Sequence, residues 1–173
     1  FALFTSVRNM VHAYEILAAR LPYRVLLQGE LPKARLLELF VEKPSVLFAT
    51  SSFWEGVDVP GRALSLVAID RLPFASPSDP LVAARIEALE ARGVEAFSAY
   101  QVPRAAIALR QGFGRLIRSR SDRGIVAILD RRIVTRGYGR TFLGSLPDVR
   151  RFARFEELGV FWEAVEQAFT EEG

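Results

Sequence analysis

Five short apolar runs separated by longer helical stretches constrain the fold of this 173-residue chain more than any other feature. Runs of this length, rich in Val, Leu, Ile and Phe, predict strands over Ala2–Ser6, Arg24–Gln28, Ser45–Thr50, Ser65–Leu72 and Gly124–Leu129. Between them apolar residues recur at helical spacing, which predicts helices over 7–21, 34–41, 80–92, 96–111 and 155–169. Strands that alternate with helices predict an α/β fold, in which helices cover both faces of a mostly parallel sheet.

Residues 1–173 have the length of one domain, and half of them are apolar, which is enough for a core. No apolar run approaches the 18 or so residues that a membrane-spanning helix needs, and no signal peptide is visible. We therefore expect a cytoplasmic protein. Because the chain lacks an initiator methionine, we also expect it to be part of a longer protein.

Two residue types that often build active sites are nearly absent. The chain has no cysteine, so it contains no disulfide or thiolate metal site, and His12 is its only histidine. A zinc site and a Ser-His-Asp triad are both disfavoured on this ground. We expect no metal site in this chain.

The net charge of +3 hides a strong asymmetry. Residues 104–154 contain 13 arginines and three aspartates, whereas residues 155–173 contain six glutamates and no basic residue. A basic block with interleaved aromatic residues is typical of a surface that binds a polyanion. Arginine outnumbers lysine 21 to 2, so codon bias is an alternative explanation.

Polar residues follow each predicted strand. In a parallel sheet the carboxyl ends of the strands share one edge, where ligands bind. The residues expected at this edge are Thr5, Ser6, Gln28, the segment Thr50–Asp58, Asp70, Arg71 and Asp130.

The segment Gln111-Gly-Phe-Gly114-Arg115-Leu-Ile-Arg118 has the spacing of a phosphate site. On a helix, residues 111, 115 and 118 would share one face and direct an amide and two guanidiniums at one point. Such a group can stabilise charge on a transferring phosphoryl group. The alternative is a solvated basic helix face. Two glycines inside a helix are unfavourable, so either something approaches the backbone closely or the helix begins only here.

The segment 48–61, which follows the third strand, is rich in hydrogen-bonding groups. Hydroxyls of Thr50 and Ser51 suit phosphate oxygens, and Trp54 could stack on a base. Core packing is the alternative for Phe53 and Trp54, and a turn or cap role is the alternative for Asp58.

No Gly-Lys pair exists in the chain, so it lacks the loop that cradles nucleotide phosphates in a Walker A motif. It has arginines for a γ-phosphate and little to hold the rest of a nucleotide. The sequence therefore resembles half of an active site. Arg71, which follows the fourth strand, either forms a salt bridge or contacts a phosphate.

This pattern resembles the second RecA-like motor domain of superfamily 2 DNA helicases, most closely the DinG group, which is related to the XPD helicases. The segment 111–118 is similar to motif VI and Leu3-Phe-Thr-Ser6 to motif IV. The segment Thr50–Asp58, with its run Trp54-Glu-Gly-Val-Asp58, is similar to motif V. The resemblance also includes Asp70-Arg-Leu-Pro-Phe74 and Arg123–Asp130, and it covers residues 2 to about 150. It implies a RecA-like three-layer α/β/α sandwich.

The resemblance implies that ATP lies between two motor domains. Arg118 would be the arginine finger, beside Arg115 and Gln111, and the cleft would be lined by Glu55, Gly56, Asp58 and Gly114. Ser6 and Thr50 would contact single-stranded DNA. The remaining candidates for DNA contact are Thr5, Ser51, Trp54 and Arg71.

The family further implies 5′→3′ translocation, Mg²⁺ bound with the ATP, and a role in DNA repair. Related XPD-like helicases commonly carry an iron–sulfur cluster in the first motor domain, so such a cluster would lie outside this chain. We expect a monomer whose partners are single-stranded DNA and its own N-terminal domain, and a fragment that hydrolyses no ATP alone. The alternative is a non-catalytic module that binds single-stranded nucleic acid.

Overall fold

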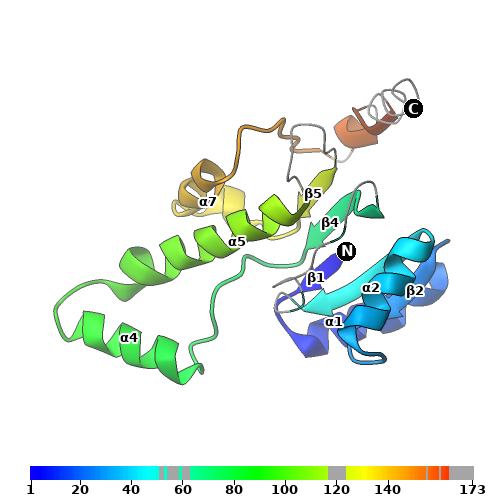
Figure 1. The fold of residues 1–173 in the computed structure, drawn as a ribbon. Helices are drawn as coiled ribbons and strands as arrows, with labels where there is room; N and C mark the ends of the chain where they lie inside the picture. The colour runs from blue at the N-terminus through cyan, green and yellow to red at the C-terminus, as the bar shows by residue number, and fades with distance from the viewer. Residues whose placement is uncertain are drawn as a thin grey trace.

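The computed structural model describes residues 1–50, 53, 59, 63–116, 124–154, 156–159 and 161–163, and only the backbone of residues 115 and 116. Within this part, five strands form one sheet in which every neighbouring pair is parallel (Figure 1). Their order across the sheet is β2-β3-β1-β4-β5. The strands are β1 (Ala2–Phe4), β2 (Arg24–Leu27), β3 (Ser45–Thr50), β4 (Leu66–Ile69) and β5 (Ile125–Ile128). All five predicted strands are confirmed; β3 has the predicted bounds and the other four are shorter than predicted.

The helices are α1 (Val7–Leu17), α2 (Lys33–Glu42), α4 (Pro80–Glu90), α5 (Val102–Leu116), α6 (Arg132–Thr135) and α7 (Gly139–Ser145). A 3₁₀ turn, η1 (Ala18–Arg20), follows α1, and a π-helical turn, η3 (Phe97–Gln101), leads directly into α5. The sequence did not predict α6 and α7. Of the predicted last helix, residues 156–159 and 161–163 are helical, and the rest lies outside the described residues.

Helices cover both faces of the sheet. On one face, the ring of Tyr14 from α1 packs edge-on against Phe48 of β3 at 5.8 Å. On the other face, Phe40 of α2 packs against Phe1 at 4.6 Å, and buried residues of α2, α5 and α7 form one continuous core. Right-handed crossovers explain this arrangement, because β1–α1–β2 and β2–α2–β3 run in opposite directions across the sheet. The three-layer α/β/α prediction is confirmed.

The position of a strand in the sheet decides its burial. Residues 47–50 of β3, an interior strand, are all buried, as its continuous apolar run predicts. The sequence predicts the same for β5, and here it is wrong: all four residues are only half-buried, and Leu129 just beyond them is 65% exposed. The reason is that β5 lies at the edge of the sheet.

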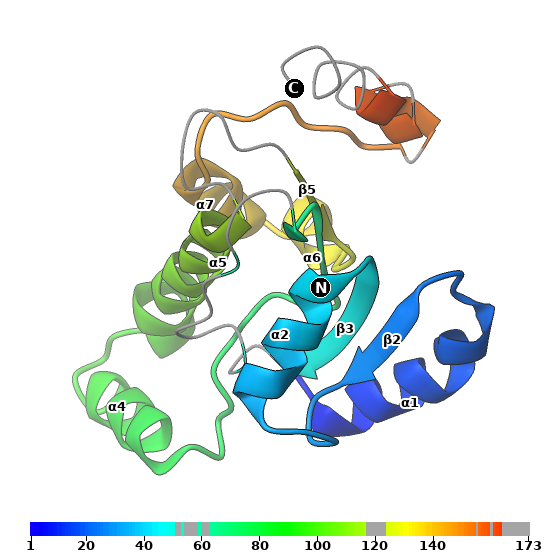
Figure 2. The ribbon, with the colours of Figure 1, turned by 45° about the vertical axis from the view of Figure 1, so that its right-hand side comes forward.

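Residues 75–96 form an excursion between β4 and α5, which we call the arm. In both ribbon views the arm and the first turns of α5 extend away from the sheet (Figure 2). Asp79 caps α4 by accepting hydrogen bonds from the N–H groups of Leu81 and Val82, and Pro80 occupies the first helical position. At the start of α5, Val102 and Ala105 are buried in the main core, so α5 is the element that joins the arm to the body.

Candidate functional site

The strand order reverses between β1 and β4. The chain leaves β1 toward β2, on one side, and leaves β4 toward β5, on the other. At such a reversal the outgoing connections separate and leave a crevice outside the carboxyl ends of the strands, which is where ligands bind in open α/β sheets. Three of the candidate DNA-contact residues, Thr5, Ser6 and Arg71, follow these two strands directly.

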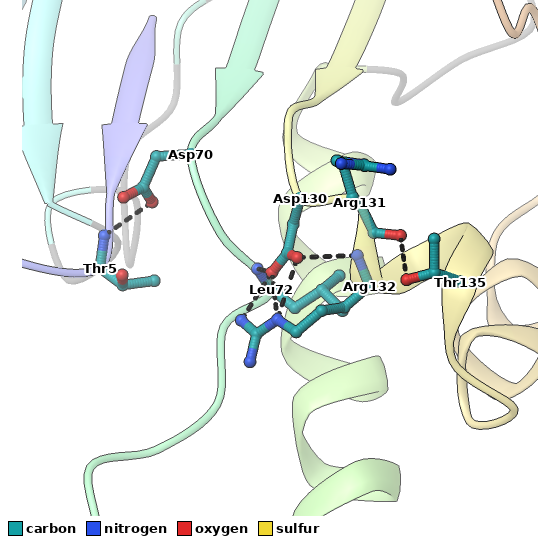
Figure 3. A network of polar contacts seen from close by, with 7 residues as sticks. All are labelled: Thr5, Asp70, Leu72, Asp130, Arg131, Arg132 and Thr135. Carbon is teal, nitrogen blue, oxygen red and sulfur yellow. Dashed lines mark hydrogen bonds and ion pairs between the residues drawn. The ribbon is translucent and has the colours of Figure 1, made fainter.

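Asp70 and Thr5 join the two strands at this point. The backbone N–H of Thr5 donates to Oδ1 of Asp70 at 3.0 Å (Figure 3). Burial raises the pKa of Asp70, and the hydrogen bond from Thr5 acts against this shift. The next residue, Arg71, is exposed, and its guanidinium makes no hydrogen bond or ion pair with any residue in the described part of the chain. Within that part Arg71 forms no salt bridge, although its positive charge acts to lower the pKa of the neighbouring Asp70 carboxyl, against the effect of burial.

Two other DNA-contact candidates have structural roles. Ser6 is the N-cap of α1, and its Oγ accepts from the N–H of Asn9 at 3.4 Å. Thr50 is only 8% exposed, and both its N–H (2.7 Å) and its Oγ1 (3.1 Å) donate to Oε1 of Gln28. The Thr50 hydroxyl has one hydrogen to donate, so it could donate to a phosphate oxygen only by giving up its hydrogen bond to Gln28.

Asp130 and Arg132 form a charged pair at the carboxyl end of β5. Oδ2 of Asp130 accepts from the N–H of Leu72 at 2.9 Å and from Nη2 of Arg132 at 2.6 Å, and Nε of Arg132 lies 3.0 Å from both carboxylate oxygens (Figure 3). These bonds from Arg132 lower the pKa of Asp130 to about 2. The pair fixes the point where the chain leaves β4.

The strand pattern predicts Asp130 at this edge but predicts no role for Arg132. A carboxylate directly after an apolar run, followed two residues later by an arginine, was the available signal. In a block with 13 arginines that signal does not distinguish Arg132 from its neighbours.

Three residues expected to line the nucleotide cleft, Glu55, Gly56 and Asp58, lie outside the described residues. The same holds for two residues expected to contact DNA, Ser51 and Trp54. Phe53 is described. It is 4% exposed and packs in the main core, with Nζ of Lys33 5.1 Å from the centre of its ring. For Phe53 the core-packing alternative is confirmed.

Helix α5 runs through both glycines of the segment 111–118 as far as Leu116. The hypothesis that a helix begins only at these glycines is therefore wrong. Leu109 and Phe113 are buried on one side of the helix, whereas Gln111 and Gly114 are exposed. Burial of the apolar face offsets the unfavourable helix propensity of glycine, about 1 kcal/mol at each position.

Two of the proposed nucleotide contacts, Gln111 and Gly114, lie on the exposed face of α5. A Cβ added at Gly114 would meet nothing within 4 Å outside its own helix among the described residues, so no part of the described fold requires a glycine here. Arg115 lies on the last turn of α5, where only its backbone is described, and Arg118 lies outside the described residues.

Among the residues that the structure describes, no group of three or more His, Cys, Asp or Glu side chains is placed to hold a metal ion. None of the described helices combines the length and the apolar character needed to cross a bilayer.

Comparison with known proteins agrees with this arrangement. The family model described as "Helicase C-terminal domain" matches residues 1–149. The ATP-dependent DNA helicase YoaA of Haemophilus influenzae is 53% identical over 87% of this chain and 24% of its own length. The ATP-dependent helicase DinG of Mycobacterium tuberculosis is 47% identical over 84% of this chain and 22% of its own length.

Solved structures show the same fold. One titled "XPD_Helicase" has a TM-score of 0.62 at 17% identity and covers 87% of this chain and 28% of its own. This likeness confirms the RecA-like architecture.

The fold and the family match together define a helicase motor domain, and the chain belongs to the helicase C-terminal domain family. The predicted resemblance to the second motor domain of DinG-like, XPD-related helicases is confirmed. The chain spans about a quarter of the length of these curated relatives.

Proposed function

We propose that this chain is the second motor domain of an ATP-dependent 5′→3′ DNA helicase. It supplies the arginine finger and half of the ATP cleft, and it holds single-stranded DNA. The observation that carries the proposal is helix α5, which brings Gln111 and Gly114 to an exposed face and leads toward Arg118, in a chain that has no phosphate loop of its own.

In this proposal the nucleotide is shared with an N-terminal motor domain. That domain would hold the adenosine and the inner phosphates, while Gln111, Arg115 and Arg118 would approach the γ-phosphate from the α5 side. Arginine suits this role because its planar fork binds phosphate oxygens at two points and stabilises the charge that develops during transfer. The side of the cleft that belongs to this chain would also include Glu55, Gly56 and Asp58.

Mg²⁺ would neutralise phosphate charge when ATP is bound. Because the described residues offer no cluster of metal ligands, the phosphates and the N-terminal domain would hold it. An iron–sulfur cluster, if the protein has one, would also belong to that domain, since this chain has no cysteine.

The DNA would cross the carboxyl edge of the sheet at the strand-order reversal. Thr5, Ser6 and Arg71 lie on this edge, and Thr50, Ser51 and Trp54 belong to the segment that begins at the neighbouring end of β3. The two sites share one scaffold, so closure of the ATP cleft would move the DNA-holding edge relative to the other domain. We further propose that the protein acts in DNA repair as a cytoplasmic monomer.

The test is DNA-stimulated ATP hydrolysis by the full-length protein. Strong stimulation by single strands supports the motor, and helicase-like turnover by residues 1–173 alone would contradict the half-site. The alternative is a non-catalytic module that binds single-stranded nucleic acid. It would replace the motor if the full-length protein bound single strands without hydrolysing ATP.

A further inference from the structure

Four aromatic rings pack together where the arm joins the body. They belong to the segment after β4, the π-helical turn before α5, and the start of α7: Phe74, Phe97, Tyr138 and Phe142. Phe74 and Phe97, which bracket the arm, stack at 5.6 Å with an interplanar angle of 20°. Tyr138 meets both of these rings edge-on, at 5.8 and 5.3 Å. The two ends of the arm are thus closed against each other and against α7.

Arg132 links this cluster to the sheet. Its guanidinium pairs with Asp130 through Nε and Nη2, and its Cζ lies 5.5 Å from the centre of the Phe74 ring. A planar guanidinium can hold a carboxylate at two points and cover an aromatic ring at the same time, which a lysine ammonium cannot do. The contact chain therefore runs from the carboxyl end of β5 through Arg132 to the rings.

On one side of the cluster, helices α6 and α7 pack closely against each other. A Cβ at Gly139 would lie 2.0 Å from the carbonyl oxygen of Ile133, so the two helices are in backbone contact there. When the cluster is disturbed, Phe74 and Phe97 are therefore the rings that would move.

A shift of Phe97 would change the direction of the α5 axis. The residues of α5 that are buried in the main core, Val102, Ala105, Ala106 and Leu109, centre on Ala106, whose carbonyl accepts from Oγ of Ser145 at 3.3 Å, so the helix would tilt about this point. At 1.5 Å per residue, Phe97 lies about 13 Å before this point and Gln111 about 7 Å after it. A 1 Å shift of Phe97 then displaces Gln111 by about 0.5 Å in the opposite direction. Misplacement by 1 Å can cost about 100-fold in rate, so half of that displacement would cost about 10-fold.

We propose that Arg132 is a positioning residue: by holding Asp130 and covering Phe74, it sets the direction of α5 and hence the placement of the proposed γ-phosphate contacts. The proposal rests on the proposed function, because it assigns Arg132 a role in the same catalytic cleft. Arg132 itself touches neither nucleotide nor DNA.

The experiment uses the full-length protein with Arg132→Lys, which keeps the charge but loses the fork and the ring cover. We expect the kcat of DNA-stimulated ATP hydrolysis to fall about 10-fold, with the KM for ATP and the DNA concentration for half-stimulation each within about twofold of wild type. Hydrogen exchange should accelerate at the amides of residues 97–104. Phe74→Leu should produce the same loss, and the double variant should lose little more, because both changes act on one contact.

Two controls separate positioning from general destabilisation. Arg131→Lys alters the neighbouring exposed arginine, and Asp79→Ala removes the cap of α4 in the arm; both should leave kcat unchanged. Wild-type kcat in Arg132→Lys, or an equal loss in Asp79→Ala, would overturn the positioning role while leaving the motor intact. A wild-type protein without DNA-stimulated hydrolysis would overturn the proposed function, and the positioning role with it.

Discussion

Gly114→Ala tests whether the glycine near the end of α5 is needed for folding or for the approach of a nucleotide or the facing motor domain. The residue is exposed and lies within the helix, and among the described residues an added Cβ would meet nothing within 4 Å outside that helix. If folding alone decided, alanine would be the better residue, since glycine is about 1 kcal/mol less favourable in a helix interior. A bound nucleotide or the facing motor domain, by contrast, would meet the new methyl group.

The expected change in the free energy of unfolding follows from the position of Gly114 within the helix. We expect Gly114→Ala to raise the free energy of unfolding by about 1 kcal/mol, which for a domain of this size raises the midpoint of thermal unfolding by about 2–4 °C. DNA-stimulated ATP hydrolysis by the full-length protein should fall at the same time. Thermal unfolding of the 173-residue chain and steady-state hydrolysis by the full-length protein measure the two effects.

Gly144→Ala in α7 is the matched control. A Cβ there also meets nothing within 4 Å, but the site lies away from the exposed face of α5. It should stabilise without loss of hydrolysis. If Gly114→Ala were more stable and fully active, the claim that something approaches the backbone at Gly114 would be refuted. If it were less stable, the argument from helix propensity would fail.

Substitutions at three further residues test the carboxyl edge of the sheet. Pairing with Arg132 lowers the pKa of Asp130 from 3.8 to about 2. At most about 2 kcal/mol of stability is therefore present above pH 4 and is lost between pH 4 and 2. In urea titrations, Asp130→Asn should reduce this loss of stability at acidic pH. The pKa of Asp70 is raised, so its contribution has the opposite sign and stability is gained as the pH falls toward 3.8. Asp70→Asn, which keeps an oxygen for the Thr5 N–H, should leave the thermal midpoint at neutral pH unchanged or slightly higher, and a loss of several degrees would contradict the buried-charge argument. Ser6→Ala should cost about 1 kcal/mol through loss of the cap. Ser6→Asp should keep the cap and weaken binding of single-stranded DNA in fluorescence anisotropy, and unchanged affinity would remove Ser6 from the DNA path.

The central sheet was predictable because its signal is local. Each strand is a short run of apolar residues that ends in a polar residue or a glycine, and the polar ends locate one edge of the sheet without any tertiary information. Gly29 illustrates this: it follows Gln28 and has φ +104°, a backbone conformation that side chains other than glycine rarely adopt. The edge position of β5 was not predictable, because no residue within a strand records which strands lie beside it.

The short helices and the Asp130–Arg132 pair were missed for physical reasons. Helix α6 has four residues and α7 has seven, too few for apolar residues to recur at helical spacing, and α7 contains two glycines. Their stability comes from packing, as the backbone contact between Gly139 and Ile133 shows. The helix through Gly112 and Gly114 was uncertain for the same reason: burial of Leu109 and Phe113 outweighs local propensity.

The most direct test of the account is DNA-stimulated ATP hydrolysis by the full-length protein with and without Arg118→Ala. Removal of an arginine finger costs on the order of 10³ in rate. We therefore expect strong stimulation by single strands in the wild type, collapse of that rate in the variant, and nearly unchanged DNA affinity without nucleotide. Full hydrolysis together with lost DNA binding in Arg118→Ala would contradict the assignment of this arginine to the ATP cleft.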